Sequence, residues 1–185
     1  MPHFRGFIAI ELDASSALIQ FQQELVQSGA HIKLVEPHNI HLTLKFLGDT
    51  DESLIDPITT ILTDAAKTTA PFQLSLQGTG VFPNEKYIRV IWIGMTATDI
   101  ITPLAKYIDT HLSTLGFKLE ARAFSPHLTV ARVKSAQNID QLLSVVHQHH
   151  SDHFASQQIT ALSLKKSDLT PTGPIYTTLS EIPLN

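Results

Sequence analysis

The sequence predicts an α+β fold with two lobes of antiparallel strands, related by a pseudo-two-fold axis, with outer helices around a central cleft. Strand-like and helix-like segments mix without the regular alternation of a doubly wound parallel sheet. The tripeptide His-Leu-Thr occurs at 41–43 and again at 127–129, in a strand-like context both times. No linker-like or low-complexity stretch divides the chain, so residues 1–185 are expected to form a single bilobal domain.

The first half of the chain alternates apolar strands with helices that have clear ends. Residues 4–12 are rich in apolar, aromatic and β-branched side chains, which favours a buried strand. Ser15 and Ser16 are capping types before a helix that Gly29 ends. Gly48 and Asp49 form a turn signal. The predicted elements are a strand at 4–12, a helix at 17–28, strands at 32–35 and 40–47, and a helix at 53–67.

The second half of the chain also consists of predicted strands and helices with signals at their ends. Pro83 and Asn84 indicate a turn between two strands, and Gly116 closes a long helix. A loop rich in proline and glycine, around residues 171–174, separates the last two strands. The predicted elements are strands at 72–82 and 87–93, a helix at 98–115, a strand at 124–133, a helix at 139–150, and strands at 159–164 and 175–179.

Composition excludes several kinds of chemistry. The chain of 185 residues contains no cysteine, which excludes disulfides, thiol catalysis, thiolate zinc sites and iron–sulfur clusters. The formal net charge is −4, whereas a protein that coats long nucleic acid is normally basic. Any contact with nucleic acid is therefore expected to be small and local. No export signal or membrane-spanning run is visible, so we expect a soluble, cytoplasmic protein.

The two His-Leu-Thr strands carry the candidate catalytic residues. Because residues i and i+2 share one face of a strand, His41 is expected beside Thr43, and His127 beside Thr129. Histidine titrates near ~6.5, so a neutral ring can take a proton from water while a protonated ring gives one to a leaving oxygen. The threonine hydroxyls can hydrogen-bond non-bridging phosphate oxygens. This set predicts metal-independent attack on a phosphodiester, most aptly a cyclic one, and leaves open which histidine is the acid.

The residues around these strands resemble a known family. HLTLKFLG at 41–48 and SPHLTVAR at 125–132 resemble the two signatures of the 2H phosphoesterase superfamily. They are most similar to its RNA 2′,3′-cyclic phosphodiesterase branch, also called 2′-5′ RNA ligase. FRGFIAIEL at 4–12 and RVIWIG at 89–94 extend the resemblance over most of the chain. The resemblance implies hydrolysis of 2′,3′-cyclic phosphate ends of RNA or nucleotides to 2′-phosphomonoesters. In some members it also implies reversible joining of RNA ends through a 2′-5′ bond.

The resemblance also assigns roles by motif. It implies that His41 gives a proton to the departing 3′ oxygen and that His127 is the base that activates water. Thr43 and Thr129 would hold the phosphate. It further suggests that Arg132 reaches the substrate, although simple alternation from His127 puts Arg132 on the opposite face, so that a β-bulge or the strand end would be needed.

Three further residues are candidates for substrate binding, each with a structural alternative. By alternation Lys45 shares the face of His41 and would add positive charge near the phosphate; otherwise it is an exposed strand lysine. Phe7 and Phe82 are candidates to stack on a base, and otherwise pack in the core. Arg89 begins an apolar strand and is read as a structural or rim charge.

Four histidines cluster near the end of the last predicted helix, at 139–150, and raise the alternative of a metal site. His147, His149, His150 and His153 offer pairs at helical spacing, but no acidic residue lies between a pair as in His-Glu-x-x-His. We interpret the cluster as a solvated helix end rather than a metal site. Gly78 and Gly80 lie within a predicted strand pair and do not precede a helix, so they do not form a phosphate loop.

The partners follow from this interpretation. We expect an RNA 3′ end or a small cyclic nucleotide as substrate, no cofactor, no metal, no membrane contact and a monomeric chain. One alternative is a nucleotide- or RNA-end-binding module that keeps the cleft without turnover. A second is a metalloenzyme built on the histidine cluster, whose activity a chelator would abolish.

Overall fold

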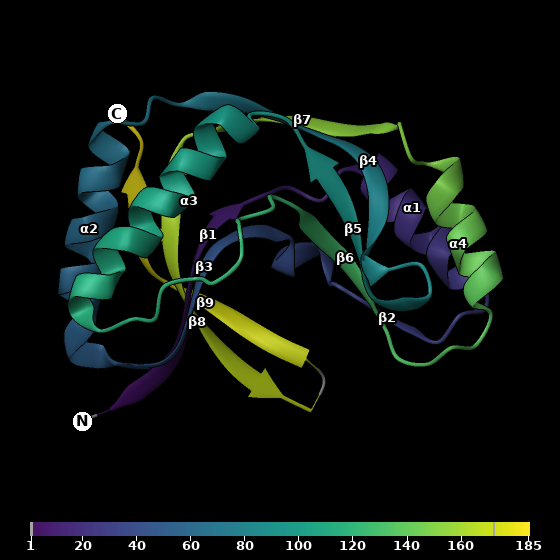
Figure 1. The fold of residues 1–185 in the computed structure, drawn as a ribbon, viewed down its shortest axis with the longest axis horizontal. Coiled ribbons are helices and arrows are strands. Elements are labelled where there is room, and N and C mark those ends of the chain that lie inside the picture. The colour runs from purple at the N-terminus through teal and green to yellow at the C-terminus, as the bar shows by residue number, and fades with distance from the viewer. Residues whose placement is uncertain (1, 172) are drawn as a thin grey trace.

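The computed structural model describes residues 2–171 and 173–185, and within them the chain forms two lobes, each built on one antiparallel sheet. In Figure 1 the two sheets lie between helices that cover their outer sides. This confirms the predicted α+β class and the bilobal arrangement. Each lobe contains one of the two His-Leu-Thr segments.

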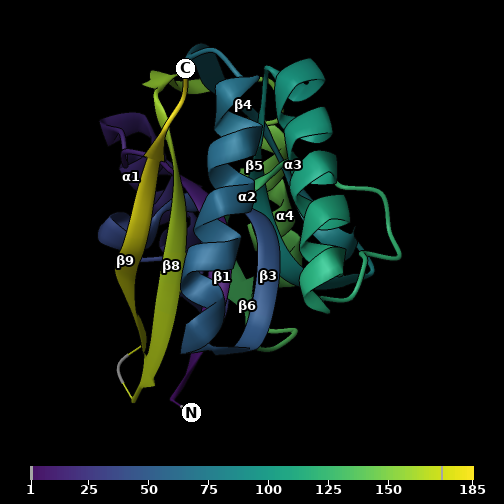
Figure 2. The ribbon, with the colours of Figure 1, turned by 90° about the vertical axis from the view of Figure 1, so that its left-hand side faces the viewer.

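The first lobe, called here the β3 lobe, is a sheet of four strands with two helices. The strand order is β3-β1-β8-β9, and helices α2 and α3 pack against one another and against this sheet (Figure 2). The elements are β1 (His3–Glu11), β3 (His41–Asp51), α2 (Ile55–Lys67), α3 (Thr98–Leu112), β8 (Ala161–Thr170) and β9 (Gly173–Pro183), with short 3-10 helices η2 (Glu52–Leu54) and η3 (Ser113–Leu115) flanking α2 and α3.

The second lobe, called here the β6 lobe, is a sheet of five strands in the order β2-β6-β5-β4-β7. Helices α1 and α4 cover its outer side, at the right of Figure 1. The elements are α1 (Ser16–Gln27), β2 (Ile32–Leu34), β4 (Phe72–Asn84), β5 (Tyr87–Met95), β6 (Leu128–Val133), α4 (Ile139–Gln148) and β7 (His153–Ile159), with a 3-10 turn η1 (Pro37–Asn39) leading into β3.

The predicted helix boundaries agree closely with the structure because their end signals act locally. The Ser15 hydroxyl accepts a hydrogen bond from the Leu18 amide and so caps α1. One face of α1 is buried through four side chains at helical spacing, which are Leu18, Phe21, Gln22 and Leu25. The predicted helix at 98–115 is instead an α-helix to Leu112 followed by the 3-10 turn η3, which ends at Gly116 with φ of 91°.

The predicted end of the strand at 40–47 is wrong. β3 continues to Asp51, because Gly48 pairs with Gly6 of β1 and adopts a left-handed φ of 72° inside the ladder. The pairing then skips Leu47, so that Phe46 lies opposite Phe7. Gly48 is thus part of a β-bulge rather than of a turn, and only glycine adopts this φ without strain.

The boundaries of two further predicted strands are also wrong. The predicted strand at 124–133 begins only at Leu128, so His127 lies just before β6. The predicted strand at 159–164 is in fact the end of β7 and the start of β8, which belong to different sheets. The chain changes sheet at Thr160, where no turn signal marks the change.

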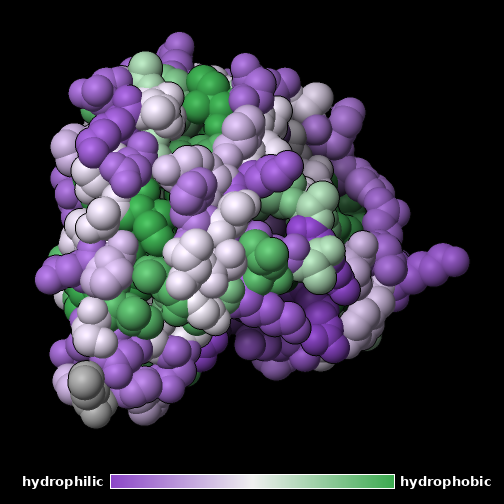
Figure 3. Space-filling view, turned by 60° about the vertical axis from the view of Figure 1, so that its left-hand side comes forward, coloured by the Kyte–Doolittle hydropathy of each residue, from purple (hydrophilic) through white to green (hydrophobic). Residues whose placement is uncertain are grey.

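Over residues 2–171 and 173–185, no helix is both long enough and apolar enough to cross a membrane. On the face seen in Figure 3, hydrophilic residues interrupt the apolar patches.

Candidate active site

The two strands that carry the predicted site have the same irregularity. In β3, Thr43 pairs with Ala9 and Lys45 with Ile8, so Leu44 is skipped. In β6, Thr129 pairs with Trp92 and Ala131 with Ile91, so Val130 is skipped. Leu44 and Val130 each follow the threonine of a His-Leu-Thr segment. Both lobes therefore have a β-bulge at the equivalent position.

In β3 the bulge reverses the expected faces after Thr43. Directly paired residues of an antiparallel ladder point to the same face. Thr43 therefore shares the face of Ala9, whereas Lys45 shares the opposite face with fully buried Ile8. Phe46 pairs with Phe7 and is 61% exposed.

In β6 the bulge instead agrees with the predicted role of Arg132. Trp92 and Val90 are two residues apart in β5 and share one face. Thr129 pairs with Trp92, and Arg132 pairs with Val90. Arg132 therefore lies on the face of Thr129, by means of the bulge that its predicted role required.

Both histidine rings are fixed by a main-chain carbonyl two residues earlier. The Nδ1 of His41 is 2.6 Å from the Asn39 carbonyl oxygen, and the Nδ1 of His127 is 2.7 Å from that of Ser125. A carbonyl only accepts, so each ring carries its proton on Nδ1 and leaves Nε2 as the nitrogen available for proton transfer. The Nε2 of His41 is 3.0 Å from the Thr43 hydroxyl.

The ring of His41 is enclosed by two aromatic rings and several charges. Its centroid is 5.0 Å from that of Phe7 and 5.2 Å from that of Tyr176. Burial lowers the pKa of His41; the Asn39 carbonyl raises it, Lys165 lowers it, Glu11 raises it and Arg132 lowers it. The net effect is a pKa below the usual value, so the free protein holds this ring neutral near pH 7.

Arg132 connects the two lobes electrostatically. It belongs to β6, yet its charge lowers the pKa of His41 on β3 and opposes the rise that burial causes in the pKa of Tyr176 on β9. Strands β3 and β6 are also in direct contact. Arg132 therefore lies near enough to His41 and Tyr176 to act on them across the boundary between the lobes.

His127 is placed by a stack of aromatic side chains in the β6 lobe. Its ring meets the edge of Phe82 at 4.9 Å between centroids, and Phe82 lies 5.4 Å from Trp92. Trp92 lies flat on Gly80, where an added Cβ would come within 2.2 Å of the indole. Gly80 thus allows the close approach of Trp92, and the structure has no helix after it that would make a phosphate loop.

The expectation that Lys45 shares the face of His41 is wrong. Its side chain is 2% exposed, and Nζ lies 2.5 Å from Asp109 of α3 and 3.2 Å from Glu120. Nζ also donates to the Lys118 carbonyl. The bulge at Leu44 turns Lys45 toward the helices, where it joins β3 to α3 and to the following loop.

Sequence reasoning missed three residues beside His41. Glu11 pairs with His41 in the ladder between β1 and β3, and it accepts hydrogen bonds from Lys165 of β8 and Thr178 of β9. The hydrogen bond from Lys165, opposed by burial, lowers the pKa of Glu11. Tyr176 of β9 contacts the rings of both His41 and Phe7. Glu11 comes from β1, whereas Lys165 and Tyr176 come from the last two strands of the chain, and no local pattern signals these contacts.

The histidine cluster divides among separate partners. His147 contacts Glu85, His149 contacts Glu24 and Asp152, and His153 contacts Ser156. In the part of the chain that the structure describes, no group of three or more histidine or acidic side chains is placed to hold a metal ion.

The two lobes each carry a His-Leu-Thr segment whose threonine precedes an equivalent β-bulge, which is the pattern expected of a two-histidine phosphoesterase. The family model for LigT-like phosphoesterases matches residues 8–92 and again residues 93–176. Each copy of this match contains one His-Leu-Thr segment. The chain belongs to the LigT-like phosphoesterase family.

Relatives and solved structures extend this likeness over nearly the whole chain. The RNA 2′,3′-cyclic phosphodiesterase of Methanothermobacter thermautotrophicus is 39% identical over 175 residues, which are 94% of this chain and 95% of that protein. That of Methanocaldococcus jannaschii is 38% identical over 179 residues, 96% of this chain and 99% of the relative. The structure of TT0787 from Thermus thermophilus superposes with a TM-score of 0.82 at 30% identity, covering 97% of both chains. Escherichia coli LigT complexed with 3′-AMP shares the fold, with a TM-score of 0.74 at 22% identity, and covers 100% of this chain and 99% of its own.

Proposed function

We propose that this protein hydrolyses 2′,3′-cyclic phosphate ends of RNA or nucleotides to 2′-phosphomonoesters, without a metal ion, through His41 and His127. The observation that carries the proposal is the equivalent placement of the two histidines. Each donates Nδ1–H to a carbonyl and keeps Nε2 for proton transfer, one on each lobe. The names of the relatives support the same substrate class.

The reaction would proceed in line at phosphorus. Nε2 of His127 takes a proton from water as the water oxygen bonds to phosphorus. The bond from phosphorus to O3′ breaks, and Nε2 of His41 supplies the proton that O3′ needs to become a hydroxyl. The product keeps its phosphate on O2′. If a 5′-hydroxyl replaces water, the same steps form a 2′-5′ bond, which would account for reversible ligation.

The remaining residues would stabilise charge in the transition state. Thr43 and Thr129 offer hydroxyls to the non-bridging oxygens, one from each lobe. Arg132 lies on the face of Thr129 and offers a guanidinium that can bind two oxygens at once. Phe7 and Phe82 each contact a catalytic histidine ring, so they orient these rings. Phe46 is the exposed aromatic group beside Phe7 that can stack on a base.

The electrostatics of His41 have a consequence for its role as acid. The neutral ring of the free protein carries no proton on Nε2, so an acid role requires protonation when the substrate binds. A phosphodiester anion beside the ring favours the imidazolium and offsets the effects of burial, Lys165 and Arg132. We therefore infer that substrate binding and proton uptake by His41 are coupled.

The test is hydrolysis of an RNA oligonucleotide that ends in a 2′,3′-cyclic phosphate, in the presence of EDTA. We expect a 2′-monoester as product, and His41→Ala and His127→Ala should each reduce kcat by about 10²–10⁴-fold. Thr43→Ala and Thr129→Ala should reduce it less, because each removes one phosphate contact and no proton carrier.

Two results would contradict the proposal. Near-normal turnover in either histidine variant would exclude the acid–base pair. Binding of the cyclic end without turnover by the wild type would instead favour a non-catalytic binding module. As a control, His153→Asn changes a histidine of the cluster near α4 and should leave turnover unchanged in EDTA.

A further inference from the structure

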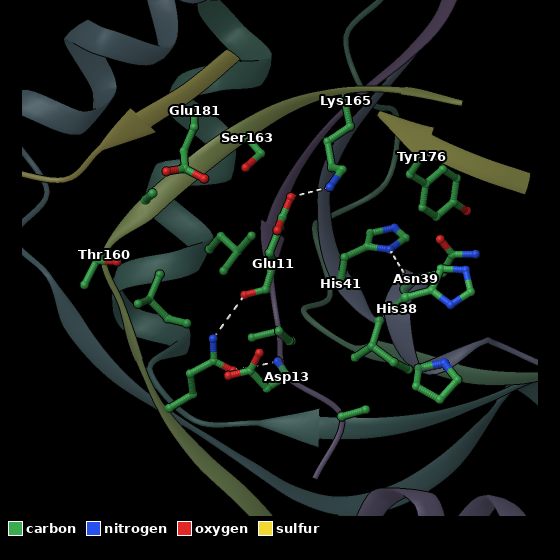
Figure 4. A pocket seen from close by; sticks show the side chains of 18 of the residues that line it. Glu11, Asp13, His38, Asn39, His41, Thr160, Ser163, Lys165, Tyr176 and Glu181 are labelled. Atoms are coloured by element: carbon green, nitrogen blue, oxygen red, sulfur yellow. Dashed lines mark hydrogen bonds and ion pairs between the residues drawn. The ribbon is translucent and has the colours of Figure 1, made fainter. Parts of the chain in front are cut away.

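A polar pocket opens beside His41 on the inner face of the β3 lobe. It has a volume of about 400 Å³, within the range of sites for small ligands. Figure 4 shows His41 and Tyr176 on one side of it and Ser163 and Glu181 on the other, with Glu11 and Lys165 between them. The reaction proposed above uses only its His41 edge.

Strand register connects this pocket to the proposed phosphate position. Thr43 pairs with Ala9, Ala9 with Ser163, and Ser163 with Glu181, so these four residues form one row across β3, β1, β8 and β9. Adjacent strands lie about 4.8 Å apart, which puts Ser163 roughly 10 Å from Thr43 along the sheet. The methyl group of Ala9 is the smallest side chain that could stand between them.

The surroundings of Ser163 also indicate a ligand in this pocket. Its residue surface is only 2% exposed, its hydroxyl has no hydrogen-bond partner among the described residues, and it lines the pocket. The hydroxyl is not sealed in the core, since it is absent from the buried unpartnered atoms of the described residues, so it is open to a molecule in the pocket. Glu181 faces it across the ladder, and its carboxylate also makes no hydrogen bond or ion pair within the described chain, whereas Glu11 is already bound by Lys165 and Thr178.

The chemistry of the pocket selects what can enter it. Glu11, Asp13 and Glu181 line it, against the cation of Lys165, so beyond its His41 edge it favours groups that donate hydrogen bonds. The leaving O3′ belongs to the ribose that carries the cyclic phosphate. If His41 protonates O3′, this ribose and its base must lie on the His41 side, where the pocket is.

We propose that this pocket binds the terminal nucleoside of the substrate and selects bases that carry an exocyclic amino group, through the Glu181 carboxylate and the Ser163 hydroxyl. The inference rests on the proposed function above. A carboxylate accepts a hydrogen bond from the N4 amino group of cytosine. It meets only a carbonyl oxygen at the same position of uracil, and two acceptors repel one another.

The experiment compares cytidine 2′,3′-cyclic monophosphate with the uridine analogue, which differ at this position. We expect kcat/KM to favour cytidine by about tenfold, the order of discrimination that a side-chain hydrogen bond to a base edge provides. Glu181→Gln presents an amide that can donate or accept, so the ratio should fall toward one. Ser163→Ala should raise KM for cytidine with kcat unchanged.

Glu52→Gln is the matched control, because Glu52 lies in η2 outside the pocket, and it should keep the wild-type ratio. Equal kcat/KM for the two nucleotides in the wild type, or a preference that survives Glu181→Gln, would overturn the inference. If neither nucleotide is hydrolysed, the proposed function fails, and calorimetry still tests the pocket. Cytidine 2′-monophosphate should then bind more tightly than uridine 2′-monophosphate, and equal affinities would reject the pocket.

Discussion

Single side chains around His41 set the protonation state on which the proposed reaction depends. Lys165 and Arg132 lower the pKa of His41, while Glu11 raises it. An acid must be protonated to act, so in the free protein kcat/KM should fall as pH rises through this lowered pKa. Each neighbouring charge therefore moves the alkaline limb of the pH profile.

Replacing Lys165 with methionine should shift that limb to higher pH. The change removes a cation that disfavours the imidazolium, so the pKa of His41 rises toward its usual value and the protonated ring persists to higher pH. The measurement is kcat/KM against pH with a cyclic mononucleotide. Lys166→Met is the control, since Lys166 pairs with Asp168. A limb that moves to lower pH would show that Lys165 does not act on the acid.

The strand face on which a side chain lies was predictable where side chains alternate regularly, but not past a β-bulge. His41 and Thr43 are two residues apart with no bulge between them, so their shared face follows from strand geometry. Lys45 and Arg132 lie past a bulge that no residue type announces, so simple alternation misplaces both. Glu11, Lys165 and Tyr176 reach the site through long-range pairing, which a single sequence does not show.

At the scale of elements, His149 links α1 to the turn between α4 and β7. Its Nε2 lies 2.7 Å from Glu24 of α1, and its Nδ1 lies 2.8 Å from Asp152. Its ring packs against Phe21 and Phe154. Burial alone would lower the pKa of His149, but the hydrogen bonds and charges of Glu24 and Asp152 outweigh it and raise the pKa.

The sign of this shift predicts how stability depends on pH. Because the pKa of His149 is raised in the folded state, protonation of its ring adds to the free energy of unfolding. This contribution is fully present below the unfolded-state pKa of ~6.5 and is lost as pH rises through the folded-state pKa. His149→Asn should therefore lower the unfolding free energy by about 1 kcal/mol at pH 6 and by less at pH 8.5. Urea unfolding at both pH values measures this. A loss that grows with pH would contradict it, and His153→Asn is the control.

Elements with local end signals were predicted well, and those defined by sheet membership were not. The helices follow from caps, glycines and helical spacing, which act within one turn. The passage from β7 to β8 at Thr160 leaves one sheet and enters the other without a glycine or proline. Apolar periodicity reports burial but not which sheet buries a strand, so this boundary was not visible.

At the scale of the whole molecule, the chain passes repeatedly between the lobes. β1 belongs to one sheet, β2 to the other, β3 to the first again, and β8 returns from the second. Neither lobe is a continuous segment of the chain. We therefore expect both lobes to unfold in one cooperative transition.

Lys45→Met tests this coupling, because Lys45 is in the β3 lobe and the single tryptophan, Trp92, is in the β6 lobe. The change leaves Asp109 without its buried cation and should cost about 2 kcal/mol, or roughly 4–8 °C in Tm. Trp92 fluorescence and far-ultraviolet circular dichroism should shift together. Lys67→Met, at an exposed ion pair, is the control. A Trp92 midpoint that stays in place would mean that the lobes unfold separately.

The equivalent bulges after Thr43 and Thr129 give corresponding places in the two lobes to unlike side chains. Phe46 stands where the other lobe has Arg132, three residues beyond the threonine on each strand. On the proposed function, an aromatic ring would face one side of the bound ester and a planar cation would face the other. The two ends of the substrate would then be distinguished, and the substrate would bind in one preferred direction.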